Sequence, residues 1–142
     1  MSGGQVTRPG VPDVIRGQFF ESDPLVFRAY LTDADGSPLF SSDFTTKQLA
    51  LNVYQTSGNT PRTAVYTAPT PGPCNSFIAT GPSLLTTGWQ RGGAGYNFEF
   101  ELASRVFTPA AGITYRYEFV LQVTSLDYVT LVFELLCVRG AQ

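Results

Sequence analysis

The most regular alternation of apolar and polar residues lies near the C-terminal end of the chain, between Thr114 and Val138. From residue 115 to 123, apolar residues occupy every second position, and Arg, Glu and Gln fill most of the positions between them. A two-residue period places apolar side chains on one face of a β-strand. After a polar turn, residues 129–138 carry apolar residues on both faces. The pattern predicts two long strands joined by a turn, the second covered on both sides.

Shorter segments with the same period occur through the rest of the chain. In residues 97–102, Phe and Leu at every second position alternate with Glu, and residues 33–36 end in Asp-Gly, a strong turn signal. Residues 84–87 are compatible with a strand or a helical turn. Seven strands at this spacing predict an all-β sandwich. They span residues 25–31, 47–55, 62–67, 76–80, 97–102, 115–123 and 129–138. The predicted core consists of Phe27, Leu31, Leu51, Val53, Phe98, Phe100, Tyr115, Phe119, Leu121, Leu131, Phe133 and Leu135.

The N-terminal segment, residues 1–18, differs from the rest because it is rich in Gly and Pro and has no usable period. The sequence therefore predicts an extended arm over residues 1–18 and a β-sandwich domain over residues 19–142. Such an arm contacts a neighbouring molecule or packs along its own domain. If it acts as a strap on a neighbour, deleting residues 1–18 leaves the sandwich folded. Its candidate interaction residues are Val6, Arg8, Val11, Val14, Ile15 and Arg16.

A Gly-rich loop at residues 88–95 surrounds Trp89 and Arg91. Trp is enriched at the centres of protein interfaces, so these two residues are also candidates for a contact with a partner. The alternative is that Trp89 folds over one end of the sandwich as a lid. The loop is not a phosphate-binding loop, because no Gly-Lys-Ser/Thr follows it.

Composition narrows the class of partner. Only 14% of the residues are charged, against about 25% in ordinary soluble domains. The basic residues are Arg except for Lys47, and Arg is enriched at protein contacts while Lys is depleted. This favours a surface covered by other proteins, although composition drift in a GC-rich genome would give the same bias. The net charge of −2 without a basic run argues against nucleic acid, and no apolar run approaches the ~20 residues of a membrane span.

Candidate catalytic groups are few, because the chain has no His and so lacks the commonest general base and most zinc sites. Glu99 and Glu101 share a strand face roughly 7 Å apart, as a glycosidase pair would, but their position opposite Phe98 and Phe100 favours a solvated outer face. The acidic turn at residues 33–36 lacks the later ligands of a calcium loop. Cys74 and Cys137 are expected to be free thiols. We therefore expect no enzyme, no catalytic or metal site and no cofactor.

Two features of the sequence resemble known families. Gly112-Ile113-Thr114-Tyr115, preceded by Phe107, resembles the corner at which immunoglobulin-like domains enter a late strand. The segment from Phe27 to Gly36 is similar to the opening of small β-sandwich virion proteins of tailed bacteriophages. Residues 95–98 and 112–119 resemble later parts of those proteins, and the likeness covers roughly Val26 to Glu134. The resemblance implies an immunoglobulin-like antiparallel β-sandwich and transfers no catalytic residue.

The resemblance implies a structural protein of the virion, assembled in the host cytoplasm. The leading hypothesis is a capsid decoration (cement) protein that binds and stabilises the shell. A head–tail connector or a tail or baseplate component is the alternative in the same class. Its partners would be the major capsid protein or other virion proteins, and a homo-oligomer, by likeness a trimer, is expected. A carbohydrate-binding module that uses Trp89, Tyr96 and Tyr54 is the alternative from another class.

Overall fold

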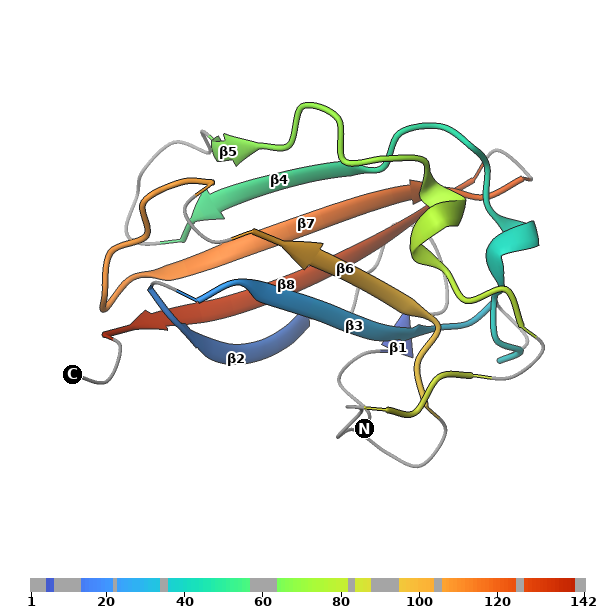
Figure 1. Ribbon diagram of the computed structural model, residues 1–142, viewed down its shortest axis with the longest axis horizontal. Helices are drawn as coiled ribbons and strands as arrows, with labels where there is room; N and C mark the ends of the chain where they lie inside the picture. Colours follow the sequence, from blue (N-terminus) through green and yellow to red (C-terminus); the bar gives the residue numbers. More distant parts are fainter. Residues whose placement is uncertain are drawn as a thin grey trace.

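A computed structural model of the chain describes residues 5–6, 14–21, 23–33, 36–56, 64–81, 84–87, 95–103, 106–124 and 127–139. This part of the chain forms two β-sheets, and β3 and β6 lie across the larger one (Figure 1). The three-stranded sheet has the order β1 (Gln5–Val6), β3 (Leu25–Leu31) and β6 (Phe98–Leu102). The five-stranded sheet has the order β2 (Val14–Phe20), β8 (Tyr128–Val138), β7 (Thr114–Gln122), β4 (Ala50–Gln55) and β5 (Ala64–Thr67). The predicted all-β sandwich is confirmed.

The directions of the strands differ in part from an antiparallel sandwich. The pairs β3–β6, β4–β5, β4–β7 and β7–β8 are antiparallel, as predicted. The pairs β1–β3 and β2–β8 are parallel. A hairpin turn forces its two strands to be antiparallel, but strands from opposite ends of the chain are free to pair in either direction. The parallel pairing of β1 and β2 could therefore not be predicted from turn signals in the sequence.

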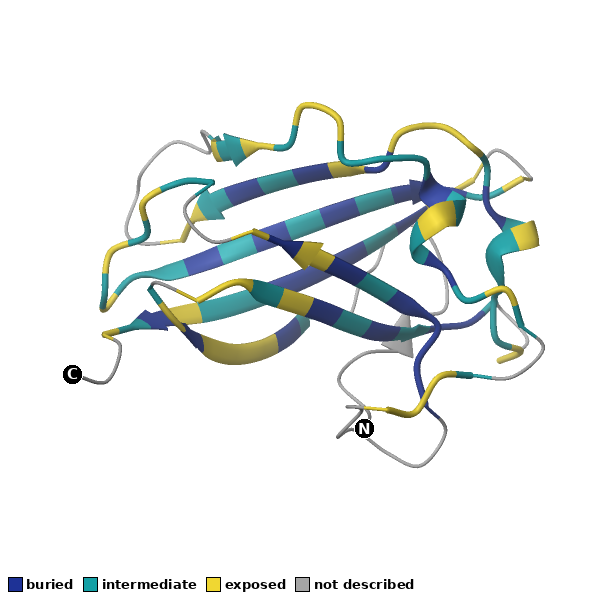
Figure 2. Ribbon diagram, viewed as in Figure 1, coloured by how far each residue is buried: buried dark blue, intermediate teal, exposed yellow. Residues whose placement is uncertain are grey.

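The core lies between the two sheets and is rich in aromatic rings. The ring of Phe27 in β3 lies 5.0 Å from Tyr117, 5.1 Å from Phe119 and 4.8 Å from Phe133, measured between ring centroids. Phe119 also contacts Phe98 at 5.4 Å. These contacts join β3 and β6 to β7 and β8, and buried and exposed positions alternate along the strands (Figure 2). All predicted core residues are buried except Leu135, which is half-buried.

The N-terminal segment is the main difference from the sequence-based expectation. Val14–Phe20 forms β2, which pairs along its whole length with β8. Ile15 and Phe19 are only 3% and 7% exposed and belong to the core. The expected boundary after Gln18 therefore falls inside a strand. The reason is that β2 takes its apolar partners from β8, at the opposite end of the chain, and its own short pattern is interrupted by Gly17.

Loops and short helices complete the domain. The 3₁₀ helices η1 (Ser41–Asp43) and η2 (Cys74–Phe77) are the only helices in the described ranges, and η2 lies where a strand over residues 76–80 was expected. That expectation was wrong because the segment follows a Pro-rich connector, and only Ile78 forms a bridge, with Phe98. The predicted turn is confirmed at its described residues: Gly36 N–H donates to the Asp33 carbonyl at 3.1 Å.

Several buried polar contacts fix the loops to the sandwich. Asn97 accepts a hydrogen bond from Leu31 N–H and donates to the carbonyls of Leu31 and Leu39, each at 2.7 Å. The hydroxyl of Tyr115, at the start of β7, accepts a hydrogen bond from Ala110 N–H at 2.8 Å.

Both cysteines, Cys74 and Cys137, are free and buried, as predicted. Among the described residues, no helix is long and apolar enough to cross a membrane.

Candidate functional site

The five-stranded sheet has one side that points away from the three-stranded sheet, and we call this side the outer face. Tyr115, Tyr117 and Phe119 of β7 point into the core, so the residues between them point away from the three-stranded sheet. Strand register then assigns the positions on the neighbouring strands. The outer face carries Val14, Arg16, Gln18 and Phe20 of β2; Tyr128, Thr130, Val132, Glu134, Leu136 and Val138 of β8; Thr114, Arg116, Glu118, Val120 and Gln122 of β7; and Ala50, Asn52 and Tyr54 of β4. Val132 and Gln122 are buried, so they are not part of its exposed surface.

A row of ion pairs crosses the middle of the outer face. Glu134 lies directly between Arg16 on β2 and Arg116 on β7. Arg116 Nη1 is 2.8 Å from Glu134 Oε2, and Arg116 Nε is 2.6 Å from Glu118 Oε2. Arg16 Nη2 is 3.5 Å from Glu134 Oε1. Arg116 is therefore held between two carboxylates, whereas Arg16 is 72% exposed and its ion pair with Glu134 is longer.

The electrostatics of Arg116 follow from this arrangement. Partial burial by itself lowers the pKa of Arg116, but its hydrogen bonds to Glu118 and Glu134 outweigh burial, so the pKa is raised above its ordinary value. The guanidinium is therefore positively charged at physiological pH. Its side chain is 30% exposed, so the group remains within reach of a partner.

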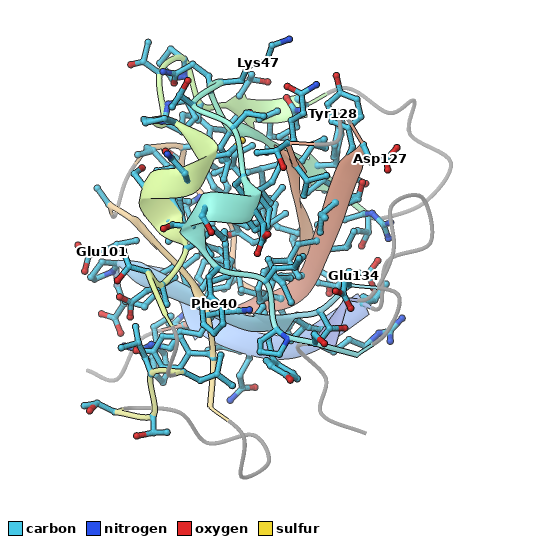
Figure 3. All side chains as sticks on the ribbon, turned by 90° about the vertical axis from the view of Figure 1, so that its right-hand side faces the viewer. Phe40, Lys47, Glu101, Asp127, Tyr128 and Glu134 are labelled. Carbon is cyan, nitrogen blue, oxygen red and sulfur yellow. The ribbon has the colours of Figure 1, made fainter. Side chains whose placement is uncertain are left out.

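Exposed apolar side chains border this charged row. Phe20 is 43% exposed, Leu136 is 37% exposed and Tyr128 is 49% exposed. Phe20 pairs with Val138 and lies diagonally next to Leu136, so these residues form one apolar margin. Figure 3 shows Glu134 and Tyr128 on the same side of the molecule, with Glu101 on the opposite side. Aromatic residues and Arg are the residue types enriched at protein interfaces.

The outward side of the three-stranded sheet carries a different arrangement. Arg28 Nε is 2.8 Å from Glu99 Oε2, and the Arg28 guanidinium lies 5.3 Å from the centre of the Tyr96 ring. Burial lowers the pKa of Arg28, but the hydrogen bond to Glu99 and the charges around it raise the pKa overall. Glu99 is therefore held in an ion pair, and Glu99 and Glu101 both lie on the less buried side of β6.

A small cleft opens at one end of the sandwich, where the β2–β3 turn meets the loop after β6. Its volume is about 20 Å³, which is room for a water molecule. The hydroxyl of Tyr117 is buried in the described structure and has no hydrogen-bond partner there, and burial raises the pKa of this tyrosine. The cleft is lined by Phe19, Glu21, Asp23, Leu25, Leu102, Ala103, Val106, Phe107, Pro109 and Tyr117.

The described residues contain no group of three or more His, Cys, Asp or Glu that could hold a metal ion.

The structure places the predicted interaction residues of the N-terminal segment in different environments. Val14 and Arg16 lie on the outer face, whereas Ile15 is a core residue and so offers no side chain to a partner. Val6 lies in β1, where it pairs with Leu31. The side chain of Val6 and all of Arg8, Val11, Trp89 and Arg91 lie outside the described residues.

Sequence reasoning missed Arg116, Glu134, Leu136 and Phe20 as members of one surface. The alternation within β7 and β8 does put Arg116 and Glu134 on the polar side of each strand. Which residues lie opposite each other depends on the register, and the turn between these strands leaves that register open.

No protein-family model, curated protein or solved structure matches this chain.

Proposed function

We propose that this chain is a structural protein of a tailed-bacteriophage virion, a decoration protein that binds the outside of the capsid and stabilises the shell. The observation that carries the proposal is the outer face, where ion-paired Arg16 and Arg116 lie beside exposed Phe20 and Leu136. A surface of this kind fits a large protein partner, because apolar area supplies affinity and fixed charges select the orientation. The low charge content and the preference for Arg over Lys agree with it.

The finer fold assignment belongs to the same proposal. We infer that the sandwich is immunoglobulin-like, with β3 and β6 as the B and E strands and β4, β7 and β8 as the C, F and G strands. The hydrogen bond from Ala110 N–H to the Tyr115 hydroxyl supports this, because immunoglobulin-like domains carry such a tyrosine near the start of strand F. This assignment says nothing of function by itself, since one fold supports many functions.

The carbohydrate-binding alternative gains no support from the geometry. Tyr96 is only 4% exposed and lies beneath Arg28, while its hydroxyl donates to the Thr87 carbonyl at 3.2 Å. Tyr96 precedes β6 and forms only an isolated bridge with Leu85, whereas Tyr54 lies in β4 of the five-stranded sheet. Stacking on a sugar needs exposed rings on one surface, and the Tyr96 ring is buried. We therefore put forward no second function.

The proposal is tested with particles that lack the protein. Purified full-length protein is added to such particles, which are then pelleted, and the bound fraction is measured. The variant Leu136→Lys places a charge on the apolar margin of the outer face and is expected to lower the bound fraction sharply. The matched control is Val26→Lys, which changes a comparably exposed apolar residue of the three-stranded sheet and adds the same charge.

The outcomes separate the candidate functions. The position of the bound protein is then found by electron microscopy of the pelleted particles. Density for the protein on the capsid surface, together with weaker binding of Leu136→Lys but not of Val26→Lys, supports a decoration protein. Density at the neck or the tail refutes decoration in favour of a connector or tail component. No particle binding, together with saturable binding to glycans by the isolated chain, refutes a virion role and supports a carbohydrate-binding module.

A further inference from the structure

The outer edge of β2 is an open margin of the five-stranded sheet. β2 stands at the end of the strand order and pairs only with β8 among the described strands (Figure 1). Its seven residues pair with β8 without a register shift. An edge strand presents backbone N–H and C=O groups that have no partner in their own sheet, so it can pair with a strand of another chain.

Direct evidence that this edge is open comes from the middle of β2. Residues 16, 17 and 18 are all exposed, and Figure 2 shows the exposed stretch at the centre of the strand. Gly17 has no side chain, so its exposed surface belongs to backbone atoms. The edge backbone at Gly17 is therefore accessible to a partner.

β2 has few of the features that keep edge strands from pairing. It contains no Pro, no Lys and no β-bulge, and its one charged residue, Arg16, is ion-paired with Glu134 of its own chain. The opposite edge of the same sheet, β5, is only four residues long and has a register shift opposite Val53 and Tyr54. A bulge twists an edge strand away from a potential partner. Of the two edges of this sheet, the β2 edge is thus the one suited to pairing.

The sequence of β2 is complementary to itself in one register. We propose that a second copy of this chain pairs with β2, antiparallel, about a two-fold axis that passes through Gly17. In this register Ile15 faces Phe19 on the core side and Val14 faces Phe20 on the outer side, so apolar residues meet on both faces. Arg16 faces Gln18, so no like charges are directly opposed.

The partner is a second copy because the strand matches its own reverse. Each Arg16 is already next to Glu134 of its own chain, so bringing two copies together adds no uncompensated charge at the edge. Phe20, which is 43% exposed, gains the apolar neighbour Val14. The inference is independent of the proposed virion function. It predicts a closed dimer, unlike the trimer expected from the family resemblance.

The first test measures mass and register on the full-length protein. Sedimentation equilibrium over a wide range of concentrations is expected to show a dimer that dissociates on dilution. Gly17→Cys should form an intermolecular disulfide on oxidation, because directly opposed residues of antiparallel strands have Cα atoms about 4.5–5.5 Å apart, within the range for a disulfide. A Cβ at Gly17 meets only Leu135 Cδ2, at 3.4 Å, so the substitution fits the fold.

Two matched controls test the register. Gln18→Cys should cross-link far more slowly, because two residues at position 18 would be diagonal neighbours about 7–8 Å apart. Val65→Cys, on the β5 edge, should cross-link no faster than the wild-type protein, whose two cysteines are buried. Fast cross-linking of Gln18→Cys or Val65→Cys, without that of Gly17→Cys, would overturn the proposed pairing.

Charge at position 18 gives an independent readout that needs no disulfide. Gln18→Lys places Lys opposite Arg16 twice in each dimer and should weaken dimerisation by about tenfold or more, whereas Gln18→Glu should strengthen it. Val65→Lys adds the same charge at the other edge and should leave the dimer unchanged. A monomer at all concentrations, a trimer, or a dimer that responds to Val65→Lys and not to Gln18→Lys would each refute the inference.

Discussion

Replacement of Tyr117 by Phe tests how the core tolerates a buried hydroxyl. Tyr117 is fully buried, and its ring packs 5.0 Å from Phe27 and 6.2 Å from Phe19. Phe keeps these ring contacts and removes only the hydroxyl, which has no hydrogen-bond partner in the described structure. A buried polar group without a partner costs about 1–3 kcal/mol. We expect Tyr117→Phe to raise the free energy of unfolding by about 1 kcal/mol, since part of that cost is offset by lost dispersion contacts.

The assay is denaturant unfolding followed by circular dichroism. A gain of about 1 kcal/mol corresponds to a rise in Tm of about 3 °C for a domain of this size. The control is Tyr128→Phe, which removes a hydroxyl from a side chain that is 49% exposed and should change stability by less than about 0.5 kcal/mol. If Tyr117→Phe lowered stability by 1 kcal/mol or more, the hydroxyl would have to be hydrogen-bonded in the cleft, and the reasoning would be refuted.

The pH dependence of stability gives the same residue a second signature. Burial raises the pKa of Tyr117 in the folded state, whereas an unfolded tyrosine has a pKa of about 10. The folded protein therefore keeps the proton that the unfolded chain loses, so this contribution is complete below pH about 10 and is lost as the pH rises further. At pH about 11 the wild-type protein should lose about 1.4 kcal/mol that Tyr117→Phe retains. An equal loss in both proteins would exclude Tyr117 as the source.

Three further predictions concern the packing of the sandwich. Phe119→Ala should lower the free energy of unfolding by about 3–5 kcal/mol, since Phe119 contacts aromatic rings from both sheets; a loss below about 1 kcal/mol in denaturant unfolding would contradict this. Asn97→Ala should cost about 3 kcal/mol, because it leaves the buried backbone groups of Leu31 and Leu39 without their side-chain partner; thermal unfolding equal to that of wild type would exclude this role. Deletion of residues 1–18 should lower Tm markedly because it removes Ile15 and most of β2, whereas the sequence alone predicted little change; unchanged melting would show that β2 contributes nothing to stability.

The local pattern of the sequence determined the strands whose two faces differ in polarity. β3, β6, β7 and β8 were all predicted to within about one residue, together with the side chains that point into the core. This succeeds because successive side chains of a strand point to opposite faces, so burial on one face is recorded as a two-residue period. The turn at Gly36 follows from an equally local property, because glycine adopts the positive φ that this position requires.

Only the tertiary structure decided how the strands combine. β2 has a short pattern interrupted by Gly17, and it becomes a strand because β8 supplies hydrogen bonds and apolar neighbours from the far end of the chain. The outer face has the same origin: Arg16, Glu134 and Arg116 form one row only once β2, β8 and β7 lie side by side in this register. The local sequence pattern shows which face of a strand is buried, because apolar and polar side chains alternate along the strand. It does not show which strands are neighbours, because strand pairing depends on contacts between residues far apart in the chain.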